Sequence, residues 1–180
     1  MKVGIAVVDV LSGMYATVAM LGALAHKTAT GQGQHLDIAL LDCVVALNSY
    51  QALNYFMGGK VPQRQGNAHS NIVPYQVFAT SDGHMILAVA NDSQYADFCR
   101  AIGRPELAED PRFRKVPDRN TNRAVLVPLL AEILKTRTRD DWIGLFNQNN
   151  VPCGPIKRIN EVFEDPQVVH RQMKVGMTHG

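Results

Sequence analysis

Apolar residues dominate the first third of the chain and are divided by short glycine-containing turns. A short apolar segment over 3–8 precedes a nearly uninterrupted apolar stretch, Met14 to Ala25, which predicts a helix running to about Thr28. Gly31 and Gly33 follow it, and glycine readily adopts the positive φ of a helix cap. The pattern therefore predicts that the helix ends in a turn at these two glycines.

An alternating segment comes next. Between His35 and Leu40, every second residue is apolar, which predicts a strand with Leu40 on its buried face. Asp42 stands where it can cap a second helix, which we expect from Cys43 to about Met57. The first third of the chain is thus predicted to contain a helix, a strand and a helix.

Residues 58–74 form a polar connection containing glycine and proline, which is typical of a linker or a loop at a site. Beyond it, two apolar segments joined by Ser81-Asp82-Gly83 predict a β-hairpin, 75–80 with 84–89. The remaining predicted elements are helices over 93–102, 122–136 and 139–148, an extended segment over 151–156, and a short helix over 160–163 that ends or bends at Asp165-Pro166.

Composition excludes several classes of protein. With 46% hydrophobic and 19% charged residues the chain is not disordered, and a formal net charge of +2 without a basic run argues against binding nucleic acid. Cys43, Cys99 and Cys153 are far apart and lack metal-site spacing, so we expect reduced thiols and no metal. The apolar amino terminus is broken at Asp9 and has no small-residue cleavage site, so we expect a cytoplasmic protein.

Charge is distributed unevenly along the chain. Of 18 Lys and Arg and 16 Asp and Glu residues, only seven fall in the first 65 positions. The uncharged stretch from Val10 to Ala25 is interrupted by small polar residues and is shorter than a membrane span, so we expect a packed helix and no membrane partner. A helix that is apolar on all sides must be covered, and the first third is therefore expected to pack inside something larger.

Four ordered segments resemble a known family. They are GIAVVDVLSGMY (4–15), TGQGQ (30–34) with LLD (40–42), GNAHSNIVPYQ (66–76) and NVPCGPI (150–156). Together they resemble the class III CoA-transferases of the CaiB/BaiF type, which include formyl-CoA and carnitine CoA-transferases and α-methylacyl-CoA racemases. The resemblance extends over nearly the whole chain and is far more specific than a lone glycine pattern.

The resemblance implies an α/β fold in two parts. Residues 1–57 would belong to the large Rossmann-like domain, 58–74 to a linker and active-site loop, and 75–163 to a small α+β domain with a β-hairpin and several helices. Residues 164–180 would begin the linker that returns to the large domain. Because family members are about twice this length, we expect a carboxy-terminal portion that is inactive alone, from a protein that forms interlocked homodimers.

The resemblance aligns Asp9 with the family's catalytic aspartate. A carboxylate can act as both nucleophile and leaving group, so Asp9 would attack an acyl-CoA thioester and then carry CoA as an aspartyl thioester. From the residues alone, Asp9 could instead simply cap the helix that follows. Both roles are compatible, since a helix amino terminus stabilises a negative charge.

The other expected substrate contacts lie in two places. His69, Ser70 and Asn71 occupy the family's substrate loop, with Gly66 allowing a sharp bend before them, although the loop's usual glycines are replaced here. Without the resemblance, the same segment would be a polar surface linker. Leu40 aligns with a residue that lines the pantetheine or acyl channel in the family. From the residues alone, Leu40 could instead be an ordinary buried leucine of a strand.

Three functions remain open on the sequence. The preferred one is an acyl-CoA:carboxylate CoA-transferase with CoA thioester as substrate, no tightly bound cofactor, and a carboxylic acid acceptor. The loop is most similar to those of relatives that use dicarboxylic acids such as succinate or glutarate. The alternatives are a 2-methylacyl-CoA racemase, in which Asp9 would be one of two acid/base groups, and a non-catalytic dimerisation or binding module.

Overall fold

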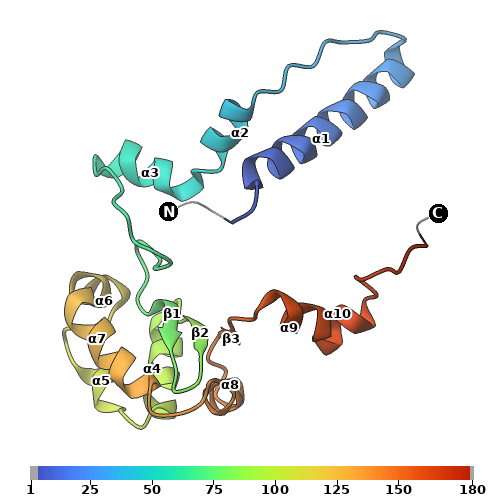
Figure 1. Cartoon of the computed structure of the whole chain (residues 1–180). Coiled ribbons are helices and arrows are strands. Elements are labelled where there is room, and N and C mark those ends of the chain that lie inside the picture. The colour runs from blue at the N-terminus through green and yellow to red at the C-terminus, as the bar shows by residue number, and fades with distance from the viewer. Residues whose placement is uncertain (1–3, 179–180) are drawn as a thin grey trace. The chain divides into compact units, whose positions relative to one another are not determined.

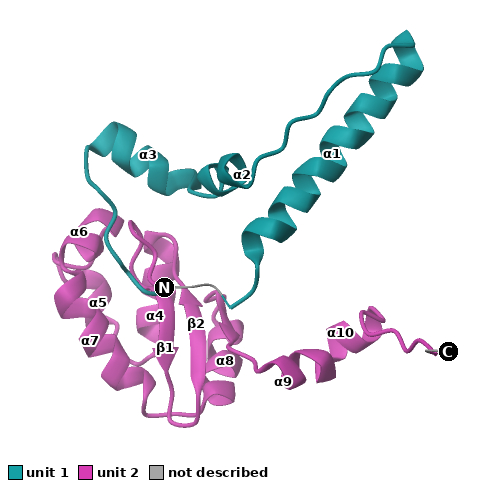
Figure 2. Cartoon of the chain, turned by 45° about the horizontal axis from the view of Figure 1, so that its top comes forward, with its two compact units in different colours: residues 1–66 teal, residues 67–180 magenta. Residues whose placement is uncertain are grey.

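The computed structural model describes residues 4–178 and divides into two compact units, 1–66 and 67–180 (Figure 2). The described residues form helices and one small antiparallel sheet. The boundary between the units falls inside the segment predicted as linker and loop, and it assigns residues 67–74 to the second unit. The loop thus folds with the sheet and not as a free connection.

The first unit begins with one long helix, α1 (Val7–Thr30), drawn in blue in Figure 1. It starts earlier than predicted and includes Asp9. It ends as predicted, because Gly31 has φ +75° and its N–H donates to the Lys27 carbonyl over 2.8 Å. Both figures show the segment after Gly31 returning alongside α1 (Figures 1 and 2).

The predicted strand over 35–40 is wrong. Residues 32–39 have no regular structure, and Leu40 is the first residue of helix α2 (Leu40–Ala46). A strand needs a neighbour for its backbone hydrogen bonds, and the described part of the first unit contains no other extended segment in a sheet. Alternation along the sequence was therefore not sufficient to produce a strand.

The single helix predicted over 43–57 is two helices, α2 and α3 (Ser49–Gly58). The break lies at Ser49, whose φ of +46° is left-handed. The Asn48 side-chain amide donates to the Val45 carbonyl over 3.2 Å at the end of α2. Asp42 lies in the first turn of α2 and does not cap it, since the N-cap is Ala39.

The apolar surface of α1 is not covered within its unit. Met14, Val18 and Leu21 are between 62% and 69% exposed, and Ser12 is the buried residue of the helix. Among the described residues, α1 is the one helix long and apolar enough to span a membrane, with a mean hydropathy of 1.7. Core helices of soluble proteins have the same composition, so this feature does not identify its surroundings.

The second unit is built on a three-stranded antiparallel sheet of order β1-β2-β3. Strands β1 (Tyr75–Ala79) and β2 (His84–Ala88) form the predicted hairpin, with Tyr75 opposite Ala88. Strand β3 (Cys153–Pro155) pairs with β2 and lies in the predicted extended segment. This pairing confirms the predicted hairpin. The hairpin could be predicted because its turn and its strands are adjacent in the sequence.

Seven helices accompany this sheet in the described residues: α4 (Asp92–Ala101), α5 (Glu106–Glu109), α6 (Val116–Thr121), α7 (Arg123–Leu134), α8 (Arg139–Gln148), α9 (Ile159–Glu164) and α10 (Pro166–His170). The predicted helices correspond to α4, α7, α8 and α9. Helices α5, α6 and α10 were not predicted, and α10 lies in the segment expected to be a linker. Each is six residues or fewer, too short for a periodic apolar pattern.

The core of the second unit is aromatic and aliphatic. Trp142 and Phe146 of α8 stack with centroids 5.3 Å apart, and Phe98 of α4 contacts the Phe146 ring. Leu126, Leu130 and Leu134 of α7 are fully buried, as is Cys99 of α4. These side chains explain why the second unit has a closed interior while the first does not.

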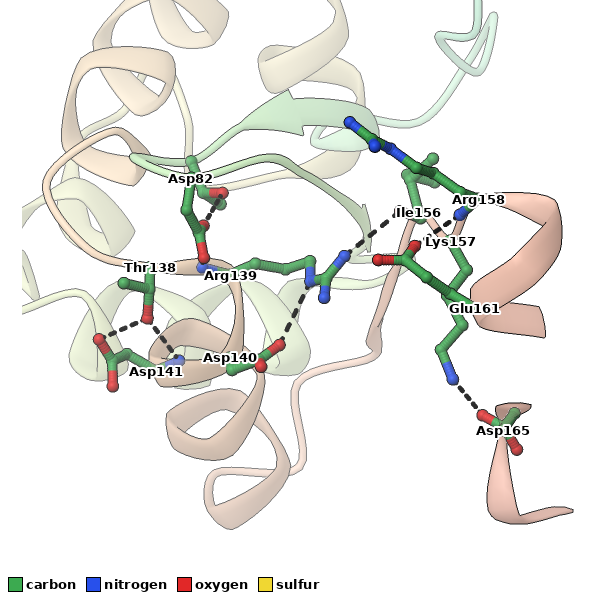
Figure 3. A network of polar contacts seen from close by, with 11 residues as sticks. Asp82, Thr138, Arg139, Asp140, Asp141, Ile156, Lys157, Arg158, Glu161 and Asp165 are labelled. Atoms are coloured by element: carbon green, nitrogen blue, oxygen red, sulfur yellow. Dashed lines mark hydrogen bonds and ion pairs between the residues drawn. The ribbon is translucent and has the colours of Figure 1, made fainter. Parts of the chain in front are cut away.

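A polar network joins the hairpin turn to α8 (Figure 3). The Asp82 carboxylate accepts from the Arg139 N–H over 2.7 Å and from the Thr80 hydroxyl over 2.9 Å, and these two bonds lower the pKa of Asp82. Lys157 pairs with Asp165, so the segment after β3 is connected to the start of α10. The network stabilises the ends of the small sheet.

Candidate active site

The loop over residues 66–74 is held by its own polar groups. Gly66 has φ +64°, so the sharp bend expected there is present. The His69 N–H donates to the Tyr75 carbonyl over 2.9 Å, and the two rings stack with centroids 5.2 Å apart. The Asn67 side-chain oxygen accepts from the Val77 N–H over 2.9 Å. The loop is thus an ordered continuation of β1.

The ring of His69 contacts the loop backbone. The Asn71 N–H donates to His69 Nδ1 over 3.1 Å. His69 and Ser70 are half-buried and Asn71 is exposed. The ring stacking and the backbone contacts show that the loop is ordered.

Two arginines distant in sequence bind the loop carbonyls. Arg123 of α7 donates through Nη2 to the carbonyls of His69 (2.6 Å) and Ser70 (3.1 Å). Arg119 of α6 donates through Nε to the Val73 carbonyl over 2.8 Å and is completely buried. Sequence analysis did not find either residue, because no motif marks them and the short helix α6 was not predicted.

Asp9 lies in the first turn of α1 with its side chain exposed. The N-cap of the helix is Ala6, and no side chain makes a capping bond there. The alternative that Asp9 caps the helix is therefore wrong. The position remains favourable for a negative charge, because unpaired N–H groups face the first turn.

Leu40 differs from its expected environment. It begins α2 and is 55% exposed, so the interpretation as a buried strand leucine is wrong. Near Leu40, an open cavity of about 210 Å³ lies between α1, residues 37–39 and α2. The cavity is lined by Tyr15, Asp37, Ile38, Ala39, Asp42, Cys43 and Ala46.

The predicted site residues belong to both units. Asp9, Leu40 and Gly66 are in the first unit, whereas His69, Ser70 and Asn71 are in the second, where they form one loop. Within residues 4–178 no group of three or more His, Cys, Asp or Glu side chains could hold a metal ion.

The cysteines are free thiols, as predicted. Burial raises the pKa of Cys99 to about 11 and also raises the pKa of Cys153. Both shifts favour the thiol over the reactive thiolate. Neither Cys99 nor Cys153 is therefore suited to act as a nucleophile.

Comparison with known proteins identifies the class. The profile of CoA-transferase family III matches residues 1–180, and the chain belongs to this family. It is 41% identical over 178 residues to a succinate–glutarate CoA-transferase of Agrobacterium fabrum, covering 98% of this chain and 44% of that protein. It is 37% identical over 176 residues to a human succinyl-CoA:glutarate CoA-transferase, covering 98% of this chain and 40% of that protein.

Solved structures agree on the fold. A CAIB/BAIF family protein from Brucella suis is 43% identical with a TM-score of 0.79, over 97% of this chain and 46% of that one. The Mycobacterium tuberculosis protein Rv3272 is 24% identical with a TM-score of 0.85, over 100% of this chain and 47% of that one, and supports the fold alone. The chain thus spans less than half the length of these relatives.

Proposed function

We propose that the protein is an acyl-CoA:carboxylate CoA-transferase that moves CoA between small dicarboxylic acids, with Asp9 as its nucleophile. The observation that carries the proposal is the 41% identity, over almost the whole chain, to a protein named succinate–glutarate CoA-transferase. The exposed carboxylate of Asp9 in the first turn of α1 supports its role. CoA thioester is a substrate in this scheme and not a resident cofactor.

The reaction uses the carboxylate of Asp9 twice. An Asp9 oxygen attacks the thioester carbonyl of the donor, the C–S bond breaks, and CoA thiolate leaves behind a mixed anhydride. The thiolate then attacks the aspartyl carbonyl, which releases the donor acid and leaves an aspartyl-CoA thioester. The acceptor carboxylate then attacks the aspartyl thioester, the C–S bond breaks, and CoA thiolate leaves a second mixed anhydride. The thiolate attacks the acceptor carbonyl of that anhydride, its C–O bond to Asp9 breaks, and the new acyl-CoA leaves with the Asp9 carboxylate regenerated.

The loop around His69 shapes the acceptor pocket in this proposal. Its ordered backbone and half-buried ring supply fixed polar groups, which suit recognition of a second carboxylate. Relatives whose names specify their acids use succinate, glutarate, mesaconate, oxalate or citramalate. The dicarboxylic acceptor is proposed from these names and from the polar loop.

The proposal also includes what the complete protein would add. We propose that the first unit belongs to a large Rossmann-like domain, that residues 164–180 lead back to it, and that the protein functions as an interlocked homodimer in the cytoplasm. The exposed apolar side chains of α1 support a protein partner for this helix. The 180-residue chain alone is expected to be inactive, because catalysis requires the thioester to be bound against Asp9.

A trapping experiment tests the function. The protein expressed from its complete reading frame is incubated with succinyl-CoA and hydroxylamine, and the peptide containing Asp9 is examined by mass spectrometry. We expect an aspartyl hydroxamate at Asp9, none in Asp9→Ala, and an unchanged signal in Asp140→Ala, an exposed control aspartate in the first turn of α8.

Two results would contradict the proposal. Turnover without a hydroxamate at Asp9 would remove the aspartyl thioester from the mechanism. Exchange of the α-hydrogen of a 2-methylacyl-CoA with deuterated water, with no CoA transfer to succinate or glutarate, would identify the racemase instead.

A further inference from the structure

The backbone of the loop over 67–75 is bound at several successive positions. Its amides at His69 and Asn71 donate to acceptors within the loop and β1, at the Tyr75 carbonyl and His69 Nδ1. Its carbonyls at His69, Ser70 and Val73 accept from arginine side chains. The carbonyl of Pro74 accepts from the Val89 N–H over 3.0 Å. These hydrogen bonds order the backbone of the loop within the second unit.

We propose that Arg123 is a positioning residue for the acceptor pocket, which it shapes by holding the carbonyls of His69 and Ser70. The inference rests on the proposed function, because the loop is the acceptor side of that site. Arg123 acts through the loop backbone and is not itself catalytic.

The geometry of the guanidinium supports this role. Its Nη2 donates to the two consecutive carbonyls and to the Asn120 side-chain oxygen over 3.0 Å, so three oxygens fix its orientation. Charged donors make stronger hydrogen bonds than neutral ones, and a rigid planar group loses less freedom than an ammonium. Partial burial lowers the pKa of Arg123, which is the direction expected for a cation removed from water.

The position of the contacts explains why they would affect substrate. The two carbonyls belong to His69 and Ser70, the loop residues expected to contact the acceptor. A shift of about 1 Å in a substrate-positioning group can change a rate by two orders of magnitude. Loosening this backbone should therefore weaken the binding of the carboxylate acceptor and not that of the CoA donor.

The test compares Arg123→Met with Arg112→Met in the protein expressed from its complete reading frame. Methionine keeps the aliphatic stem and removes every donor. Arg112 is an exposed arginine paired with Asp110 outside the loop, so it is a matched control. The measurements are hydrogen exchange of the peptide over 67–77, and KM and kcat for glutarate and for succinyl-CoA.

For Arg123→Met we expect about tenfold faster exchange in the loop and about a tenfold higher KM for glutarate, with the KM for succinyl-CoA unchanged. Arg112→Met should change neither. If Arg123→Met does not fold, Arg123→Lys replaces it, and a lysine should restore charge but not the bonds to both carbonyls.

The outcomes separate this inference from the proposed function. Unchanged loop exchange in a folded Arg123 variant would overturn the positioning role, as would faster exchange with an unchanged KM for glutarate. A wild-type protein that exchanges the loop slowly but transfers no CoA would contradict the proposed function, and with it the assignment of an acceptor pocket, while leaving the backbone contacts of Arg123 established.

Discussion

Replacement of Arg119 by methionine should strongly destabilise the second unit. The guanidinium is completely buried and donates to the carbonyls of Val73 (2.8 Å), Phe113 (2.9 Å) and Arg114 (3.2 Å) and to the Asp92 carboxylate (3.0 Å). It also lies 4.3 Å from the centroid of a tyrosine ring in α4. Methionine would keep the contact of the stem and remove all four hydrogen bonds.

The magnitude follows from what is left unpaired. Each hydrogen bond to a charged group contributes about 1.5–3 kcal/mol, but the cost of burying the guanidinium offsets part of the total. Asp92 is 40% exposed and keeps Lys115 as a partner, so the loss comes mainly from the three carbonyls that lose their donor, at about 1–3 kcal/mol each. We take about 3–5 kcal/mol as the net effect of Arg119→Met. Since domains are stable by about 5–15 kcal/mol, the unit should lose about a fifth of its stability or more.

The single tryptophan of the chain provides the assay. Trp142 lies in α8 and is 2% exposed, so its fluorescence reports the unfolding of the second unit alone. In urea, a loss of this size should lower the unfolding midpoint by about 2 M at an unchanged slope. Arg112→Met, at an exposed ion pair, should shift the free energy of unfolding by less than about 1 kcal/mol. If Arg119→Met shifted it no more than this control, the buried hydrogen bonds would not stabilise the unit and the reasoning would be refuted.

Four further predictions concern catalysis, acid stability and association. Asp9→Ala should abolish CoA transfer in the complete protein while CoA binding, measured by calorimetry, stays within about twofold; retained turnover would contradict it. His69→Ala should raise KM for the acceptor more than it lowers the melting temperature, and a large loss of stability without a change in KM would indicate a structural role. Partial burial raises the pKa of Asp92, but the hydrogen bonds and charges of Arg119 and Lys115 lower it by more, so the pKa in the folded state lies below that in the unfolded state. The stability that this carboxylate contributes is therefore present above about pH 4 and is lost as the pH falls through the folded pKa. Asp92→Asn should reduce this loss in acid titrations followed by fluorescence. The 180-residue chain should self-associate through the apolar surface of α1, and light scattering that shows a monomer at all concentrations would contradict this.

The second unit was largely predictable because its signals are local. Ser81-Asp82-Gly83 between two apolar segments predicts a hairpin from residues a few positions apart, and the apolar run of α7 is visible in the sequence. Thr138, whose side chain accepts from the Asp141 N–H, marks the start of α8 in the same way. Each of these features depends on residues a few positions apart.

The site was predictable only in part, for a related reason. The motif around His69 identifies the loop, but Arg123 is 54 residues away from it and Arg119 is 46 residues from Val73. Nothing in the sequence near either arginine distinguishes a buried guanidinium from a solvated one. The contacts that give the loop its shape are long-range, so they become visible only when the fold is known.

The first unit shows the opposite limit of pattern analysis. Alternation over 35–40 and the apolar sides of α1 predict buried surfaces, yet among the described residues the segment has no strand partner and the apolar side chains of the helix are exposed. The spacing of apolar residues shows which side of a helix or strand is apolar. Which sheet or helix packs against that side depends on tertiary contacts. The chain spans 44% of one relative that matches 98% of it, and we propose that these exposed apolar surfaces pack against the remainder of the complete protein. The same residues that make the predicted strand wrong in the chain alone therefore support our proposal that the first unit belongs to a larger domain.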